Sequence, residues 1–307
     1  MNENRNRMLI GMLALLCSVV LPALAGEVTW NTADVVSTPF PAVTYIARSG
    51  TVIRDNVTNR IALHIARVDL TAPGVRIRAR VQPPTDSGAE CKTETTLNAV
   101  SRCGAQIGIN GNYFAYRSGS DDAEVNTSLL GMAADRGVLY SFADDNRYGV
   151  NFAADNTVTF FEPADTNLTT VPAIVPYNVV SSQPSWLIRN GVLMNRPGDG
   201  GTLNPMTGFG LTANRMLVLM VCDGRNASWS DGVTCGDLAW QLSREGCVDA
   251  IALDGGGSST IVFADSKPRV VNRVPNPVLR AVGNNLLVYV GETNGPSLPT
   301  DTAPPAE

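Results

Sequence analysis

The residues best suited to chemistry lie in one short segment, 250–261, whose sequence is Ala-Ile-Ala-Leu-Asp-Gly-Gly-Gly-Ser-Ser-Thr-Ile. An apolar strand ends at the carboxylate of Asp254, and glycines and hydroxyl residues follow it. Because glycine has no Cβ, its backbone N–H groups stay open to an anion that comes close. A carboxylate beside such a loop could act on a sugar phosphate. The alternative is a tight glycine turn that only connects two strands.

A second carboxylate, Asp223, directly follows the apolar run 216–222. Residues 216–254 have the pattern strand, loop, helix, strand, which predicts a βαβ unit with parallel strands. Asp223 and Asp254 would then share the C-terminal edge of the sheet, where open α/β sheets bind ligands. If the strands are neighbours, the carboxylates lie within about 5–10 Å. Such a pair can divide acid, base or nucleophile roles in glycoside cleavage, although either aspartate could simply cap its turn.

The elements that must position these residues are mostly strands. Residues 61–70 and 75–81 flank a Thr-Ala-Pro-Gly turn and predict a β-hairpin. Three arginines alternate along its second strand, where a solvated face is favoured over an anion-binding stripe. The other predicted elements include hairpins at 148–161 and 186–194 and helices at 93–103 and 234–245. Together they indicate an α+β (mixed α/β) fold, mostly β-sheet, with the βαβ unit at 216–254 and a few flanking helices.

Composition and the chain ends narrow the class of protein. The chain has 307 residues, 44% of them hydrophobic, and a net charge of -5, which argues against nucleic acid as a partner. Arg5 and Arg7, an apolar run and then Ala-Leu-Ala-Gly predict a cleaved signal peptide; a short membrane anchor is the alternative. We expect a periplasmic or secreted protein without stable membrane insertion after cleavage. Its predicted parts are a signal peptide (1–25), a single domain (26–293) and a disordered tail (294–307).

Cysteine pairing follows from export into an oxidising compartment. Cys91 and Cys103 bracket one loop and helix, so we expect a disulfide between them. Cys235 and Cys247 stand at opposite ends of a helix about 18 Å long. That exceeds the disulfide Cα separation of about 5.5 Å. We therefore pair Cys222 with Cys235 and expect Cys247 to be a buried free thiol.

Several other chemistries fit the sequence poorly. His64 is the only histidine and lies inside a predicted strand, which argues against a Ser-His-Asp triad. No cysteine or histidine cluster has the spacing of zinc ligands. Asp121, Asp122 and Glu124 could bind calcium, but a solvated loop is the favoured interpretation. We predict no metal and no cofactor.

Several short motifs resemble one known family when they are taken in order along the chain. They are Ile-Gly-Ile-Asn-Gly-Asn-Tyr-Phe at 107–114, Cys-Asp-Gly-Arg at 222–225, the glycine segment within 248–260, Val-Val-Asn at 270–272 and a late Leu-Arg. The ordered set resembles the phosphodiester glycosidase family over about residues 45–292. The family's namesake is N-acetylglucosamine-1-phosphodiester α-N-acetylglucosaminidase, and bacterial members are often called exopolysaccharide-biosynthesis-related proteins. The resemblance implies a hydrolase that cuts a sugar from a sugar phosphodiester and leaves a phosphomonoester.

The resemblance also implies where the substrate binds. It puts Asn110 and Asn112 on a first loop, Asp223 and Arg225 on a second, Asp254, Gly255, Gly256, Gly257 and Ser258 on a third, and it matches Thr207 and Arg280 to further family positions. One departure concerns an arginine–threonine pair of the family. Here Met206 stands in place of that arginine, before Thr207. If the arginine holds phosphate, this protein binds phosphate more weakly or differently.

A mechanism can be assigned to the two aspartates. Cleaving the anomeric C–O bond builds positive charge on the sugar, which a carboxylate can stabilise or attack. We give that role to Asp254, with Asp223 as the base that activates water or as its partner. Arg225 and Arg280 are the candidates for holding phosphate, because the guanidinium fork bonds two oxygens at once. Each arginine could instead belong to a surface ion pair.

Two non-catalytic interpretations compete with the enzyme. The protein could bind envelope or secreted polysaccharide without turnover, or it could be a structural envelope protein with a relict site. Met206 favours them. The paired carboxylates count against them, since a pure binder has no need of two buried acids. The predicted partner is therefore a sugar phosphodiester or polysaccharide.

Overall fold

The computed structural model describes residues 28–30, 33–54, 57–115, 120–142, 147–162, 174–181, 186–195 and 201–291. The predicted signal peptide and tail lie outside these residues. Within the described parts the chain is mostly β-sheet with two α-helices, so the predicted predominance of strands is confirmed. Every strand pairing recorded among them is antiparallel. None of the described helices has the length and apolar character needed to cross a membrane.

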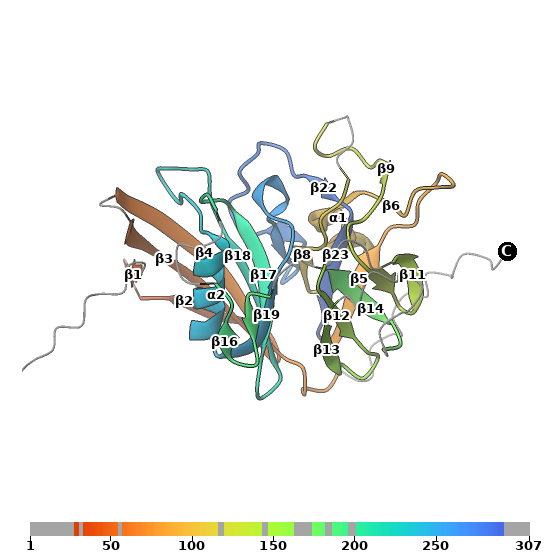
Figure 1. The fold of residues 1–307 in the computed structure, drawn as a ribbon, viewed down its shortest axis with the longest axis horizontal. Helices are drawn as coiled ribbons and strands as arrows, with labels where there is room; N and C mark the ends of the chain where they lie inside the picture. Colours follow the sequence, from red (N-terminus) through yellow and green to blue (C-terminus); the bar gives the residue numbers. More distant parts are fainter. Residues whose placement is uncertain are drawn as a thin grey trace, which may run out of the picture.

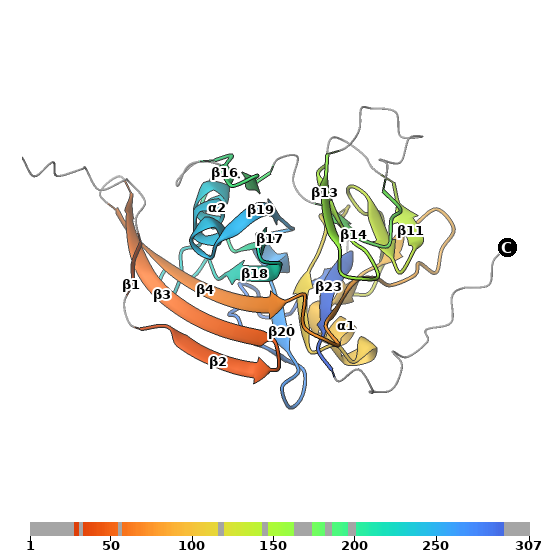
Figure 2. The ribbon, with the colours of Figure 1, turned by 90° about the horizontal axis from the view of Figure 1, so that it is seen from below.

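A nine-stranded sheet makes up one half of the molecule (Figure 1). Its order is β1-β3-β4-β18-β17-β19-β15-β16, with β2 also paired to β3. The long, bent strands β2, β3 and β4 extend it outward (Figure 2). The strands are β1 (Val28–Trp30), β2 (Val35–Phe40), β3 (Val43–Arg54), β4 (Val57–Asp69), β15 (Ile188–Arg189), β16 (Val192–Leu193), β17 (Met206–Thr212), β18 (Met216–Cys222) and β19 (Cys247–Ala252).

The centre of this sheet is buried on both faces, which explains the unbroken apolar run of β18. Leu217, Leu219 and Val221 face one core cluster, whereas Val218 and Met220 face another. The second cluster is covered by helix α2 (Cys235–Arg244), which contributes three buried apolar residues, Leu238, Ala239 and Leu242.

Helix α2 begins where the sequence predicts it, at a capping box. The Thr234 hydroxyl accepts from the Asp237 backbone N–H, and the Asp237 carboxylate accepts from the Thr234 N–H at 2.8 Å. The βαβ unit predicted at 216–254 is not confirmed as a pair of neighbouring strands. Strands β18 and β19 run in the same direction, but β17 lies between them and is antiparallel to both. Asp223 and Asp254 therefore follow strands that are two positions apart, about 10 Å, rather than neighbours.

The other half of the molecule contains two five-stranded sheets, with orders β21-β20-β8-β23-β5 and β11-β10-β14-β12-β13 (Figure 1). The first comprises β5 (Arg76–Val81), β8 (Ile107–Asn110), β20 (Ile261–Phe263), β21 (Arg269–Val270) and β23 (Asn284–Tyr289); the second comprises β10 (Ala133–Asp135), β11 (Val138–Ser141), β12 (Gly149–Phe152), β13 (Val158–Phe161) and β14 (Asn178–Ser181). Helix α1 (Thr96–Cys103) packs against β8 and β20. Two small pairs complete the described strands: β6 (Cys91–Lys92) with β9 (Asn126–Thr127), and β7 (Glu94–Thr95) with β22 (Ala281–Val282).

One continuous apolar core joins the three large sheets. Phe209 of the nine-stranded sheet, Ile109 and Leu286 of the second sheet, and Val150 and Phe152 of the third belong to the same buried cluster. Rings from two sheets meet there, with the centroids of Phe152 and Phe209 5.7 Å apart. This shared core fixes the two halves of the molecule against each other.

The hairpin predicted from 61–70 and 75–81 is wrong. Strand β4 pairs with β3 and β18, whereas β5 pairs with β23 in a different sheet. The expectation that the arginines of β5 face solvent is wrong for Arg78. Its side chain is buried and makes a two-pronged pair with Asp135, at 2.8 Å for both contacts. Asp135, on a strand distant in sequence, therefore pairs with Arg78 in place of the solvent that the sequence leads us to expect.

Neither predicted disulfide is present, since the five cysteines that the structure describes form no disulfide with one another. Cys91 and Cys103 belong to separate core clusters. The Cys222 thiol donates to the carbonyl oxygen of its neighbour Asp223, at 3.2 Å, rather than bonding to Cys235. Cys247 is buried and free, as expected, and burial raises its thiol pKa to about 12.

Candidate active site

The glycine segment is held in place by one buried side chain, Asn110, at the end of β8. Its Nδ2 donates to the carbonyl oxygen of Asp254 at 2.7 Å. Its Oδ1 accepts from the Thr207 hydroxyl at 2.7 Å and from the Thr260 N–H at 3.2 Å. The Asp254 N–H donates to the carbonyl oxygen of Gly111 at 3.0 Å. Asn110 therefore fastens the start and end of the segment to two different sheets.

Asn112 has a comparable supporting position. Its Nδ2 donates to the carbonyl oxygens of Leu130 and Met132, and its Oδ1 accepts from the Ser181 N–H and from Asn284. Asn110, Asn112 and Thr207 are each 0% exposed. The predicted role of these three residues in contacting substrate stays a prediction; the structure gives them the role of holding the site loops together.

The segment after Asp254 forms one turn of 3-10 helix, Gly256–Ser258. The Gly256 N–H donates to Pro205 O at 2.8 Å, and the N–H groups of Ser258 and Ser259 donate to oxygens within the turn. Those three N–H groups are therefore taken up by protein oxygens and are not open to an anion. Gly256 has φ +59, a left-handed conformation that favours glycine.

The glycines let two arginines come close to the turn. A Cβ built on Gly256 would lie 2.9 Å from Nη2 of Arg225, and one built on Gly257 would lie 2.7 Å from Cζ of Arg280. A methyl group at either glycine would force the guanidinium group to shift. Arg225 and Arg280 therefore lie against two successive glycines of the turn, one arginine at each. Their predicted role in holding phosphate stays a prediction.

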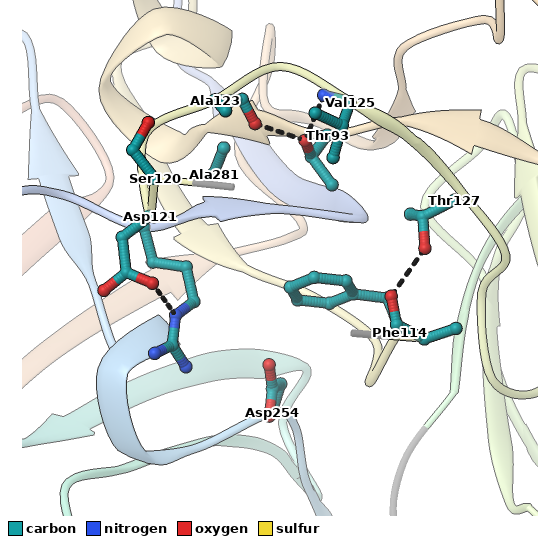
Figure 3. Close-up of a pocket in the computed structure, with 11 residues that line it drawn as sticks. Thr93, Phe114, Ser120, Asp121, Ala123, Val125, Thr127, Asp254 and Ala281 are labelled. Carbon is teal, nitrogen blue, oxygen red and sulfur yellow. Dashed lines mark hydrogen bonds and ion pairs between the residues drawn. The ribbon is translucent and has the colours of Figure 1, made fainter. Parts of the chain in front are cut away.

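Asp254 and Arg280 line a pocket of about 220 Å³. The Phe114 ring points into this space, with Asp121 to one side and Asp254 below (Figure 3). The Thr93 and Thr127 hydroxyls donate to backbone oxygens and so are not free to bind a ligand. The pocket is completed by Ala115, Ser120, Ala123, Val125 and Ala281. Charged groups therefore gather at one end of a space whose other walls are largely apolar.

The Asp254 carboxyl has a perturbed pKa. Burial raises it to about 6, because the ionised form loses its water. The Gly255 N–H and the charges of Arg280 and Arg147 limit the rise. The Ser258 hydroxyl also lowers the pKa, although its Oγ makes no hydrogen bond of good geometry. A carboxyl that titrates near neutrality in a pocket is suited to catalysis.

The second acid in this pocket is Asp121, not Asp223. Asp121 Oδ1 lies 3.4 Å from Arg280 Nε, and its Oδ2 accepts from Asn276 Nδ2 at 2.6 Å. The sequence favours a solvated loop around Asp121, with a calcium site as the alternative. Within the described residues, no group of three or more His, Cys, Asp and Glu side chains is arranged to hold a metal ion.

Asp223 lies away from the pocket lining and is 1% exposed. Its Oδ2 accepts from Trp229 Nε1 at 2.8 Å and contacts His64 Nε2 at 3.1 Å, while Oδ1 accepts from the Arg273 N–H at 2.9 Å. His64 in turn contacts the Tyr45 hydroxyl through Nδ1, at 2.7 Å. The catalytic role predicted for Asp223 stays a prediction, and these contacts favour a role in organising the Asp223–Ser230 loop.

Replacing Asp223 with Ala is expected to destabilise the fold by about 2–4 kcal/mol, because buried donors lose their acceptor. Chemical denaturation followed by circular dichroism measures this. Asp86→Ala is the matched control, because Asp86 is exposed. A loss below about 1 kcal/mol for Asp223→Ala would show that the buried network does not hold this loop.

One group near Asp254, Arg147, has no signal in the sequence. Arg147 acts on Asp254 through its charge, and its guanidinium lies 5.4 Å from the centre of the Tyr113 ring. Arg147 lies two residues before β12, in a segment without a recognisable motif. Only the assembled fold brings it near the glycine segment.

Known proteins similar to this chain identify its family and its fold. The family model described as phosphodiester glycosidase matches residues 103–289, which is more than half of the chain. This chain belongs to the phosphodiester glycosidase family. The match includes Asp223, Asp254 and Arg280, and it confirms the resemblance seen in the motifs.

Solved structures show the same fold. The catalytic domain of zebrafish N-acetylglucosamine-1-phosphodiester α-N-acetylglucosaminidase, auto-inhibited by its pro-peptide, has a TM-score of 0.62 at 18% identity, covering 87% of this chain and 88% of that one. A hypothetical protein from Synechocystis has a TM-score of 0.61 at 14% identity, covering 85% and 64%.

A curated relative is similar in sequence. The SPβ prophage-derived uncharacterized protein YomE of Bacillus subtilis (strain 168) is 24% identical over 216 residues, or 68% of this chain. This chain spans only 31% of the length of that relative.

Met206 distinguishes this member from the family pattern described above. Its side chain is 5% exposed and packs in the cluster under α2, and its Sδ would lie 3.7 Å from a Cβ on Gly255. No positive charge comes from this position. Around Asp254, positive charge comes instead from Arg280 and Arg147.

Proposed function

We propose that this phosphodiester glycosidase family member is a hydrolase that releases a sugar from a sugar phosphodiester. The observation that carries the proposal is the pocket that Asp254 shares with Arg280, where burial also raises the pKa of the Asp254 carboxyl. A volume of about 220 Å³ is below the roughly 300–1,000 Å³ of most small-molecule pockets. It suits one sugar unit rather than a length of polysaccharide, so we infer that the enzyme removes a terminal sugar.

The proposed chemistry assigns one task to each charged residue. The ionised Asp254 stabilises or attacks the anomeric carbon as the C–O bond to phosphate breaks. The bonding electrons leave with the phosphate oxygen, and a water supplies the hydroxyl of the released sugar and the proton of the phosphomonoester. Arg280 holds the phosphate through its guanidinium fork once Asp121 gives way. Phosphate is a good leaving group, so a strong general acid is not required.

The proposal includes export to the periplasm or the medium. It is supported by the N-terminal pattern of Arg5 and Arg7, an apolar run and Ala-Leu-Ala-Gly. Substrates in that compartment would be envelope or secreted glycans that carry sugar phosphodiesters.

An activity assay tests the function directly. Purified protein is incubated with methyl and p-nitrophenyl phosphodiesters of N-acetylglucosamine 1-phosphate and of other sugar 1-phosphates, and released sugar is measured. We expect turnover of at least one diester. The rival proposal, a polysaccharide binder, is favoured by the apolar Met206. Polysaccharide binding with no turnover of any diester would support that rival and contradict the hydrolase.

The pH dependence of that turnover identifies the working form of Asp254. Because the ionised form acts, kcat/KM should rise with pH through about 6 and level off above it. Bound phosphate would shift the midpoint for kcat upward, since a nearby negative charge disfavours the carboxylate. A rate that instead falls above pH 6 would mean that Asp254 acts as a proton donor.

A further inference from the structure

Two arginines outside the pocket have no acidic partner among the described residues. Arg225 is exposed, and its Nε and Nη2 donate only to the neutral Asn204 Oδ1, at 3.2 and 3.0 Å. Arg273 is also exposed, with its Cζ 3.8 Å from the centre of the Trp229 ring. Uncompensated cations on a chain of net charge -5 create a local site for an anion.

The buried Asp223 places both arginines. It accepts from the Arg273 N–H at 2.9 Å and from the Trp229 indole at 2.8 Å, and Arg225 follows it by two residues. Because this carboxylate is buried and surrounded by donors, it anchors the loop without presenting negative charge at the surface. The Trp229 ring in turn supports the Arg273 guanidinium by a cation–π contact.

A strained backbone conformation also holds the Arg225 side chain in this place. Its φ is +57, a conformation that costs a residue with a Cβ about 1 kcal/mol or more. The loop keeps it through Asn226 and Ser230, which form an isolated bridge. The result is that the Arg225 guanidinium lies against Gly256.

The glycine turn links these cations to the pocket. Arg225 approaches Gly256 and Arg280 approaches Gly257, so the two guanidinium groups lie at adjacent residues of one turn. Arg280 lines the pocket, whereas Arg225 and Arg273 do not. Positive charge therefore lies in the pocket, from Arg280, and beside it at the turn, from Arg225. The Arg273 backbone is tied to the Arg225 loop by its N–H bond to Asp223.

We propose that Arg225 and Arg273 form a second anion subsite, which binds a further phosphate on the leaving-group side of the substrate. This rests on the proposed function, in which Arg280 holds the phosphate that is cleaved from the sugar. A single phosphodiester carries one negative charge and needs only that site. The substrate class is thus a glycan or polyol with phosphate groups in series, from which a terminal sugar is removed.

Two matched substrates test the subsite: a sugar 1-phosphoglycerol and the same compound with a second phosphate on the far glycerol hydroxyl. The wild-type KM is expected to be about tenfold lower for the doubly phosphorylated compound, with the advantage shrinking as salt rises. Arg273→Gln should remove the advantage while leaving kcat on the singly phosphorylated compound within about twofold. Arg76→Gln, which removes an exposed arginine on β5, should keep the lower KM for the doubly phosphorylated compound.

Two results would overturn the subsite: no wild-type preference for the second phosphate, or an equal rise in KM for both substrates in Arg273→Gln. Melting temperature confirms that the variant is folded. If neither compound is turned over, the proposed function fails, and titration calorimetry with both compounds still decides the subsite. Tighter binding of the doubly phosphorylated compound, lost in Arg273→Gln, would support it; equal binding would reject it.

Discussion

Asp254→Asn should lower kcat for a sugar phosphodiester by at least about 1,000-fold while leaving the fold intact. The amide keeps the size of the carboxylate but can neither attack the anomeric carbon nor offset its positive charge. Substrate binding through Arg280 is retained, so KM should change far less than kcat. Released sugar, measured across substrate concentrations, separates the two effects. Retention of more than about a tenth of the wild-type kcat would remove Asp254 from the mechanism.

The control for this variant is its stability, which should rise rather than fall. Below about pH 4 the folded and unfolded chains both hold the proton of Asp254. Between about pH 4 and 6 only the folded chain keeps it, so the wild type loses stability as pH rises. The rise of the Asp254 pKa from 3.8 to about 6 lowers the free energy of unfolding by roughly 3 kcal/mol at most, and this loss is complete above pH 6. Asp254→Asn removes this penalty, so its melting temperature should exceed that of the wild type at pH 7.5 and match it near pH 4.

Local patterns predicted the individual elements well. The Asn190-Gly191 pair predicts the turn of the β15–β16 hairpin, where both residues adopt positive φ. The helix predicted at 234–245 matches α2, whose start is fixed by a capping box of Thr234 and Asp237 within four residues. Each of these features depends on residues within a few positions of one another, so a short stretch of sequence is enough to predict it.

Strand pairing was not predictable in the same way. The apolar runs of β18 and β19 fit neighbouring parallel strands, but β17 takes the place between them. An intervening helix sets the direction of the second strand and not its distance from the first. Similarly, the turn after β4 permits a hairpin, but β5 pairs along its whole length with β23. Strand pairing depends on how apolar residues are buried across the whole core, and no short stretch of sequence contains that information.

The candidate site likewise contains residues that the sequence predicts and residues that it does not. Asp254, Arg280 and the glycine segment were found from sequence, because the motif places them close to one another or the family resemblance assigns them. Asp121 and Arg147 were not, because their loops carry no pattern that indicates proximity to Asp254. The resemblance assigned Asp223 to the chemistry, yet burial and three polar contacts favour a supporting position.

The second large effect is expected at Arg280. Arg280→Gln should lower kcat/KM by about 100-fold, because one charge-assisted pair of hydrogen bonds to phosphate is lost. Arg280→Lys keeps the charge but not the planar fork, so it should recover only part of the loss. Arg76→Gln controls for the loss of one positive charge elsewhere. A kcat/KM for Arg280→Gln within about threefold of the wild type would place the phosphate elsewhere.

Gly257→Ala separates the position of Arg280 from its charge. The added Cβ would lie 2.7 Å from Arg280 Cζ and 2.8 Å from Asn276 Nδ2, so the guanidinium must move although no charge changes. Misplacement of a binding group by about 1 Å can cost up to about 100-fold. We therefore expect this methyl group to reproduce much of the Arg280→Gln defect. Combining the two changes should add little, because both remove the same contact. Fully additive losses would show that Gly257 acts on the reaction by a route independent of Arg280.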